Sequence, residues 1–256
     1  MRSLYLPFLF IAGILAAPAH AKNLTVFAAA STIQILDEIR DRWNPKNTTQ
    51  LRVIYGSSGA LARQIENGAP ADVYLSAHGN WIDYLVRQKV ARKETRKTII
   101  RNRLVLVAPT FAQFSHPFNL KADIGFILGN NGRLSIGDPR HVPAGIYARE
   151  ALTNVGLWPL LAQRTVRSSN VRLALALVQR GEVPLGIVYY TDAIQTRQVR
   201  VIAAIDGSLH APIEYQAILT SSASQIAGKL LRHLTSASSQ KVYRKFGFLP
   251  PSNHND

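Results

Sequence analysis

The polar residues that could carry out chemistry in this chain do not form a known catalytic pattern. The histidines include no pair four residues apart and no H-E-x-x-H motif. The segment GSSGA at 56–60 lacks the final glycine of a G-x-S-x-G nucleophile elbow. His141 follows Asp138 closely and is the best acid–base candidate, although a loop histidine held by a nearby carboxylate is the more ordinary interpretation. The absence of cysteine excludes thiolate nucleophiles and cysteine-ligated metals. We therefore expect a protein that is not an enzyme.

A different chemistry follows from four expected helix starts that carry no charged side chain. Turns after two predicted strands and around VPAG place Ser31, Ser58 and Ala144 at helix N-termini, and a further helix opens near Val171. The first N–H groups of a helix lack partners within it, and the helix dipole adds about half a positive charge there. Several such ends directed at one point would bind an anion without lysine or arginine. A single serine before a helix is usually only an N-cap, so their joint occurrence supports this interpretation.

Strands and helices alternate along the chain after its first 21 residues. Ser31-Thr32-Ile33-Gln34 matches a capping box, and Asn44-Pro45 ends the helix that it opens. Two sets of strand–helix units predict two α/β lobes with mostly parallel sheets, covering helices and a cleft between them. The last two strands look like returning strands. We expect strands at 24–29, 51–55, 72–76, 104–108, 134–137, 185–190, 199–204 and 213–219, and helices at 31–43, 60–67, 81–90, 145–154, 171–180, 224–236 and 239–246.

The first 21 residues are typical of a signal peptide. Arg2 precedes an apolar run of 14 residues at 4–17, and an A-x-A pattern ends at Ala21. As a helix this run would rise about 21 Å, less than the roughly 30 Å of a membrane's hydrocarbon core. We expect cleavage after Ala21, export to the periplasm, and no membrane insertion of the mature chain.

The chain is strongly basic, with 30 Lys and Arg against 15 Asp and Glu and a formal net charge of +15. Eight of the basic residues lie between Arg87 and Arg103, where Glu94 is the only acid. This segment contains no aromatic residue, which argues against nucleic-acid binding. A solvated helix end and loop, or a docking patch for a permease or an anionic membrane surface, remain the alternatives. The positive field would also speed the capture of anions.

Six segments together resemble the periplasmic molybdate-binding proteins of ABC importers. They occur in the order typical of that family and span nearly the whole chain after residue 21. The resemblance implies a two-lobed, type II periplasmic binding protein-like α/β fold. Each lobe would be a mixed, mostly parallel sheet flanked by helices, with one lobe at 22–105 plus 205–256 and the other at 106–204. The segments are VFAAAS (26–31), GSSGALARQIENGAPADVYLSA (56–77), NRLVLVAP (102–109), IGDPRHVPAGIYAREAL (136–152), VRLALALVQRGEVPLGIVYYTDA (171–193) and YRKFGF (243–248).

The resemblance also implies an oxyanion site built only from neutral donors. Ser31 and Ser58 would each use a hydroxyl and a backbone N–H, Ala144 and Val171 a backbone N–H, and Tyr189 its hydroxyl. Molybdenum would be held through the oxygens of the anion, with no direct metal ligand and no cofactor. The implied function is capture of molybdate or tungstate by a monomer that delivers it to a membrane permease.

Some features of the expected site stay open at the sequence level. Gly59 stands where other members of the family often carry serine, so Ser57 is an alternative to Ser58. Tyr190 occupies a position where small residues are common. A cavity of donors alone suits MoO₄²⁻, WO₄²⁻ or SO₄²⁻ and disfavours a protonated phosphate, whose O–H would meet no acceptor. Another tetrahedral oxyanion such as sulfate is therefore the alternative ligand.

Overall fold

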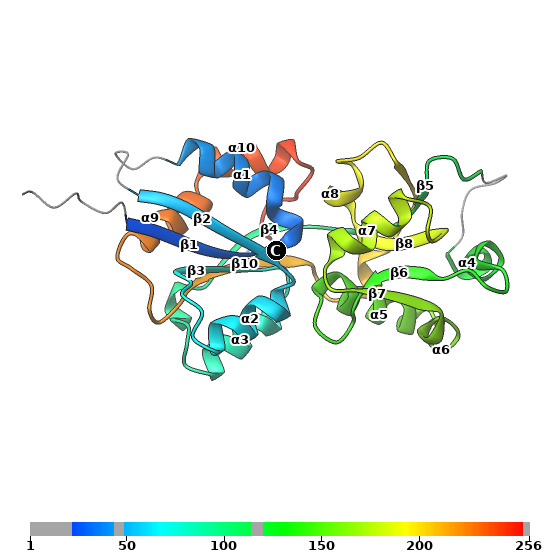
Figure 1. The fold of residues 1–256 in the computed structure, drawn as a ribbon, viewed down its shortest axis with the longest axis horizontal. Coiled ribbons are helices and arrows are strands. Elements are labelled where there is room, and N and C mark those ends of the chain that lie inside the picture. The colour runs from blue at the N-terminus through cyan, green and yellow to red at the C-terminus, as the bar shows by residue number, and fades with distance from the viewer. Residues whose placement is uncertain (1–21, 44–48, 114–119, 253–256) are drawn as a thin grey trace, which may run out of the picture.

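The computed structural model describes residues 22–43, 49–113 and 120–252. The predicted signal peptide at 1–21 and the predicted helix stop at Asn44-Pro45 lie outside the described residues. Within those ranges the strands form two five-stranded sheets. Figure 1 shows the two sheets side by side along the long axis of the molecule, each with helices on both faces. The predicted two-lobed α/β architecture is confirmed.

The first sheet carries the N-terminal half of the expected site. Its strand order is β2-β1-β3-β10-β4. β1 pairs in parallel with β2 and β3, and β10 pairs antiparallel with β3 and β4. The strands are β1 (Lys22–Ala29), β2 (Thr49–Gly56), β3 (Val73–Ser76), β4 (Lys97–Arg101) and β10 (Glu214–Leu219).

The second sheet repeats this scheme with the order β7-β6-β8-β5-β9. β6 pairs in parallel with β7 and β8, and β5 pairs antiparallel with β8 and β9. Both sheets are thus mixed, and the predicted returning strands are β9 and β10, each antiparallel to its neighbours. The strands are β5 (Leu104–Pro109), β6 (Leu134–Gly137), β7 (Thr165–Ser168), β8 (Leu185–Tyr189) and β9 (Val199–Ala204).

Helices cover both faces of each sheet. In Figure 1, α1 and α10 lie over one face of the first sheet and α2 and α3 over the other, while α5 and α7 flank the second sheet. The helices are α1 (Ile33–Arg42), α2 (Ser58–Glu66), α3 (Gly79–Arg87), α4 (Leu120–Leu128), α5 (Pro143–Asn154), α6 (Trp158–Leu161), α7 (Val171–Gln179), α8 (Tyr190–Ala193), α9 (Ala227–Leu234) and α10 (Ala237–Lys245). Short 3₁₀ turns lie at Ala30–Thr32, Lys93–Thr95, Ala162–Arg164 and Gly207–Leu209.

Alternation along β1 explains the layering around the first sheet. Phe27 packs on one face among Leu61 and Ile82 of α2 and α3. Val26 belongs to the cluster on the opposite face, which includes Leu36 of α1. All five side chains are at most 3% exposed. Burying an apolar side chain of this size contributes about 1.5–3 kcal/mol, so helix–sheet packing holds the end of β1 in place.

Five helices and strands were not expected from the sequence, among them the short helices α6 and α8. β7 is a short strand of sequence TVRS with mixed exposure, so no apolar run predicts it. β4 lies inside the basic segment 87–103, where the buried Ile99 and Ile100 form its core-facing part. That segment is therefore partly a sheet strand rather than only a solvated helix end and loop. α4 begins at Leu120, in the stretch between the strands expected at 104–108 and 134–137, where no helix was expected.

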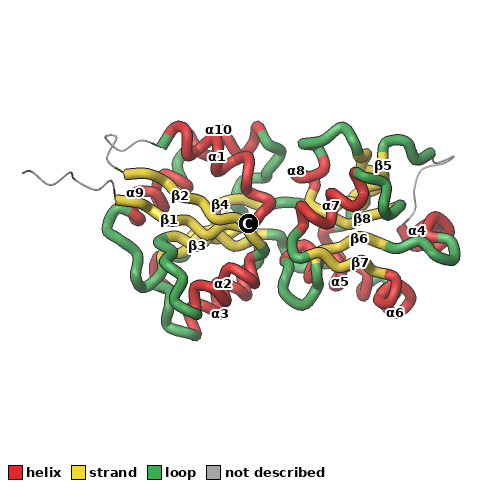
Figure 2. Tube along the Cα trace, viewed as in Figure 1, coloured by secondary structure: helices red, strands yellow, loops and turns green. Residues whose placement is uncertain are grey.

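Two chain segments connect the sheets. Asn102 and Arg103 lead from β4 to β5, and residues 205–213 lead from β9 back to β10. Figure 2 shows both connections in the middle of the molecule, between the two sets of strands. The lobe limits at 22–105 plus 205–256 and 106–204 stay a prediction, and β5 of the second sheet begins at Leu104.

Candidate functional site

A small pocket lies where the two halves of the molecule meet. It covers about 210 Å³ of space, part of it open to solvent, between the ends of strands from both sheets and the starts of three helices. The structure brings together all five residues expected to bind an oxyanion, and Ser57 with them. None of the described residues that line the pocket carries a charge. They are Ala29, Ala30, Ser31, Gly56, Ser57, Ser58, Ala77, Val142, Pro143, Ala144, Asn170, Val171 and Tyr189.

Ser31 reaches the pocket from the 3₁₀ turn that follows β1. The predicted capping box is wrong, because α1 begins at Ile33 with Thr32 as an N-cap that makes no side-chain capping bond. The Ser31 hydroxyl instead lies 2.7 Å from the hydroxyl of Tyr215 in β10, and Ser31 is 2% exposed. The Ser31 hydroxyl therefore contacts a residue 184 positions away in the sequence, in place of the capping bond within Ser31–Gln34 that the sequence suggested.

Ser58 is the first residue of α2 and is fully buried. Its hydroxyl oxygen accepts a hydrogen bond from the backbone N–H of Ala77 at 3.0 Å, so its own hydrogen remains available to a ligand. The Tyr74 hydroxyl donates to the Ser58 carbonyl at 2.7 Å and fixes the backbone at this point. As the first N–H of a helix, that of Ser58 has no acceptor within α2.

The second half contributes two further helix starts. α5 opens with Pro143, which has no N–H to satisfy and favours the first position of a helix, followed by Ala144. α7 opens with Val171 after the N-cap Asn170, whose side chain accepts from the Leu173 N–H at 3.1 Å. The helix expected to open near Val171 is therefore confirmed, with Asn170 as its N-cap. Both helices direct unpaired backbone N–H groups and a partial positive charge toward the pocket.

Tyr189 closes the pocket from the end of β8. Its side chain is 1% exposed, and its hydroxyl oxygen has no hydrogen-bond partner among the described residues. Burial raises the pKa of this phenol well above its usual value, so the group remains a neutral donor. Leaving a buried polar group unpaired costs about 1–3 kcal/mol, which a ligand oxygen would offset.

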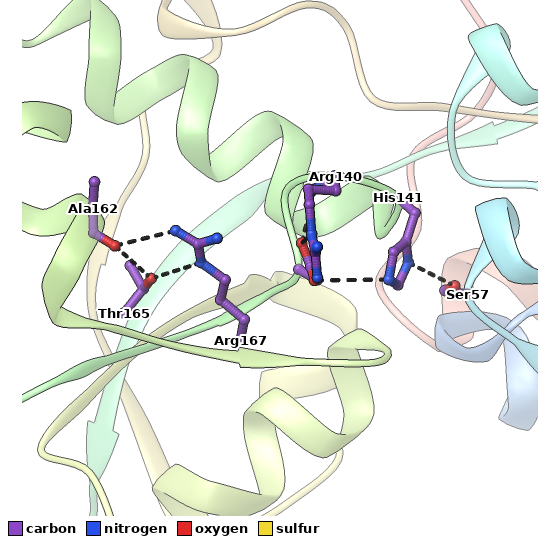
Figure 3. Close-up of polar contacts among 7 residues, drawn as sticks. Ser57, Arg140, His141, Ala162, Thr165 and Arg167 are labelled. Carbon is purple, nitrogen blue, oxygen red and sulfur yellow. Dashed lines mark hydrogen bonds and ion pairs between the residues drawn. The ribbon is translucent and has the colours of Figure 1, made fainter.

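Ser57 has a different role from Ser58. Its hydroxyl caps α2 by accepting from the Ala60 N–H at 3.3 Å and lies 3.4 Å from Nδ1 of His141 in the other half of the molecule. Figure 3 shows His141 between Ser57 and Arg140. His141 Nε2 is 3.8 Å from an oxygen of Asp138, which agrees with a loop histidine held by a carboxylate. Neither His141 nor Asp138 lines the pocket.

Gly59 marks a close approach between the two halves. A Cβ placed on Gly59 would lie 2.5 Å from the carbonyl oxygen of His141 and 2.5 Å from Cζ2 of Trp81. Such contacts are too short for any side chain without movement of the backbone. Glycine at this position lets the start of α2 touch the loop that precedes α5.

Sequence reasoning missed two polar residues behind Ser31. Tyr215 is fully buried and Asn102 is 7% exposed, and Asn102 Nδ2 donates to the Tyr215 hydroxyl at 3.2 Å. One tyrosine in an apolar strand is typical of an ordinary core, so no local signal marks Tyr215. Tyr190 lies at the same connection, with the Arg103 guanidinium 4.4 Å from its ring centre.

Two features of other classes of protein are missing from the described part of the chain. No group of three His, Cys, Asp or Glu residues there could hold a metal ion. None of its helices is long and apolar enough to cross a membrane.

Comparison with known proteins agrees with this geometry. The family of bacterial extracellular solute-binding proteins matches residues 24–249. The molybdate-binding protein ModA of Escherichia coli (strain K12) is 38% identical over 232 residues, 90% of each chain. ModA of Haemophilus influenzae is 39% identical over 244 residues, 94% of this chain and 95% of the relative. The periplasmic molybdate-binding protein of Azotobacter vinelandii has the same fold, with a TM-score of 0.76 at 23% identity over 90% of this chain and 100% of that chain. The chain belongs to the bacterial extracellular solute-binding protein family and groups there with the molybdate-binding proteins.

Proposed function

We propose that this protein binds molybdate in the pocket between its two halves and delivers it to the membrane permease of an ABC importer. Tungstate, a tetrahedral dianion of the same charge, is the second ligand. The ligand-binding residues are Ser31, Ser58, Ala144, Val171 and Tyr189, which act through hydroxyls and backbone N–H groups. Molybdenum is held through its oxygens, and no residue binds the metal directly.

One observation carries this proposal: an uncharged pocket lined by donors from both sheets contains a buried phenol that has no hydrogen-bond partner within the part of the chain that the structure describes. A dianion can be held there because hydrogen-bond donors and helix N-termini supply partial positive charge from several directions. The serine and tyrosine hydroxyls donate, and none of the described lining residues is a carboxylate that would repel the anion. The high identity to two molybdate-binding relatives supports molybdate as the ligand.

The donor set also defines which anions are excluded. Molybdate, tungstate and sulfate accept hydrogen bonds at every oxygen at neutral pH, whereas hydrogen phosphate carries an O–H that needs an acceptor. Leaving that O–H unpaired in a buried site costs about 1–3 kcal/mol. Sulfate fits the same donors and is separated from molybdate only by its smaller size, so it is the alternative to molybdate and tungstate.

The proposal places the mature protein in the periplasm, after cleavage of the chain behind Ala21. Membership of a family described as extracellular supports this location. There the lobes at 22–105 plus 205–256 and at 106–204 would close on the anion by hinge motion at the two connections. The protein would act as a monomer that binds no nucleic acid and catalyses no reaction.

Thermal unfolding with a panel of anions tests the proposal. A ligand at 100 times its Kd adds about 2.7 kcal/mol to the folded state, which raises the Tm by several degrees for a protein of this size. We expect molybdate and tungstate to raise the Tm, and phosphate to leave it unchanged. A rise in Tm with sulfate alone would identify sulfate as the ligand. If none of the anions raised the Tm, the proposed site would be refuted.

A further inference from the structure

We propose that Asn102 and Tyr215 form a hydrogen-bond relay that fixes the hydroxyl hydrogen of Ser31 toward the pocket. The relay makes Ser31 a donor that cannot switch to accepting, and so helps the site reject oxyanions that carry a proton. This inference rests on the proposed function and assigns a positioning and selectivity role to two residues that do not line the pocket.

The orientation of the Asn102 amide is fixed by its backbone neighbour. Its Oδ1 lies 2.9 Å from the backbone N–H of Arg103, which can only donate. Oδ1 is therefore the acceptor, and Nδ2 supplies the two hydrogens of the amide. These hydrogens reach the hydroxyl of Thr191 at 2.8 Å and the hydroxyl of Tyr215 at 3.2 Å.

The hydrogen bond from Asn102 determines the direction in which the Tyr215 hydroxyl donates. Its oxygen already accepts from Asn102, and its own hydrogen has two nearby hydroxyls to choose from, those of Ser31 and Tyr189. Ser31 Oγ lies at 2.7 Å, whereas the Tyr189 hydroxyl has no partner at hydrogen-bond geometry among the described residues, so the hydrogen is directed to Ser31. Burial raises the pKa of Tyr215 far above its usual value, and the phenol therefore keeps this hydrogen at neutral pH. Because Tyr215 is fully buried, solvent does not compete for it.

Ser31 is left with only one use for its hydrogen. Its oxygen accepts from Tyr215, so its O–H points to the remaining polar partner, an oxygen of the bound anion. A serine hydroxyl without this constraint can rotate and either donate or accept. A Ser31 hydroxyl that could rotate would accept a hydrogen bond from the O–H of hydrogen phosphate. In the fixed orientation its own hydrogen points at the hydrogen of that O–H, and no hydrogen bond forms.

The relay also spans the connection between the two halves. Thr191 belongs to α8 beside the second sheet, Asn102 to the connection between β4 and β5, and Tyr215 to the first sheet. The orientation of Ser31 is therefore set by residues on both sides of the pocket.

Tyr215→Phe tests the relay because it removes one hydroxyl and leaves the ring in place. Titration calorimetry should show molybdate binding weakened about three- to tenfold, the effect of one lost hydrogen bond. Hydrogen phosphate binding should stay equal or strengthen, so that the ratio of molybdate affinity to hydrogen phosphate affinity falls. This ratio is the selectivity ratio. Tyr243→Phe is the matched control: this tyrosine is 1% exposed, and its hydroxyl donates to the Leu234 carbonyl at 2.9 Å, away from the pocket. It should lower the Tm and leave the ratio unchanged.

A double-mutant cycle with Ser31→Ala shows whether Tyr215 acts through Ser31. In the Ser31→Ala background, Tyr215→Phe should change molybdate binding less than about twofold, since interacting residues are not additive. The relay would be overturned if Tyr215→Phe weakened molybdate binding equally with and without Ser31, or if it left the ratio of molybdate to phosphate affinity unchanged. Either result leaves the proposed function intact as long as the wild-type protein binds molybdate. A wild-type protein that bound no tetrahedral anion would overturn the function and the relay with it.

Discussion

At the scale of single residues, the pocket contains buried donors that are available to a ligand, and an unpaired buried donor lowers the free energy of unfolding. Tyr189 presents a buried hydroxyl that has no hydrogen-bond partner in the described ranges, and Ser58 accepts a hydrogen bond while keeping its own hydrogen free. A fully satisfied core would leave neither group available. The Tyr189 hydroxyl can form its hydrogen bond only with the ligand, so affinity and stability should respond to its removal in opposite directions.

Tyr189→Phe should therefore weaken molybdate binding and stabilise the empty protein. The loss of one donor to a buried anion costs about 1.5–3 kcal/mol of binding free energy. Removing an unpaired hydroxyl should raise the free energy of unfolding by about 1 kcal/mol, since its desolvation is no longer needed. Titration calorimetry and urea unfolding without ligand measure the two effects. A variant that is both less stable and unchanged in affinity would contradict this role of Tyr189.

At the scale of helices and strands, the site depends on three helix starts that meet across the pocket. The apolar runs of β1, β5 and β8 and the start of α7 could be predicted from the sequence, since they are set by neighbouring residues. The partner of Ser31 could not, because Tyr215 is 184 residues away and only the sheet order brings it near. β7 was missed for a related reason: as an edge strand it has no apolar run.

Gly59→Ala should disturb the contact between α2 and the loop before α5. The added Cβ would lie 2.5 Å from the His141 carbonyl oxygen, and backbone must move to make room. We expect molybdate affinity to fall by about tenfold or more, because misplaced donors lose hydrogen-bond energy steeply with geometry. Gly228→Ala is the control, since Gly228 is also the second residue of its helix and its nearest atom, on an Arg232 side chain, is 3.7 Å away. Equal affinities of the two variants would show that the close approach does not matter for binding.

The loop before α5 should show a pH dependence set by Asp138. Hydrogen bonding from Arg140, with a further contribution from its charge, lowers the pKa of Asp138 to about 2. A carboxyl whose pKa is lower in the folded state contributes stability above its unfolded pKa, about 3.9, and loses it as the pH falls toward 2. The difference in unfolding free energy between wild type and Asp138→Asn should therefore shrink between about pH 5 and pH 2. A difference that stays constant over this range would exclude the Asp138–Arg140 pair as its source.

At the scale of the whole molecule, two sheets are joined by two connections and touch at the pocket. Polar contacts between the halves include Ser57 with His141 and a hydrogen bond from Arg172 to Gln34. Several of the binding residues lie on each side, so neither half holds a complete site. Around this neutral pocket the chain carries a formal net charge of +15, so the surface rather than the site bears the positive charge.

This separation predicts that salt affects the rate of capture more than the strength of binding. A field from surface charges steers an anion toward the protein and is screened beyond about 3 Å at 1 M ionic strength, compared with about 30 Å at 0.01 M. Stopped-flow measurements should show the association rate constant for molybdate falling severalfold between these salt concentrations, with the dissociation rate constant nearly constant. If salt acted mainly on dissociation, charged side chains would have to contact the bound anion.

The most direct test of the account is a crystal structure of the protein with molybdate, in which anomalous scattering locates the molybdenum atom. We expect one strong peak inside the pocket, with the anion oxygens at hydrogen-bond distance, about 2.7–3.2 Å, from the hydroxyls of Ser31, Ser58 and Tyr189 and the N–H groups of Ala144 and Val171. A peak outside the pocket, or an anion held by a lysine or arginine side chain, would contradict the central claim that neutral donors alone bind the dianion.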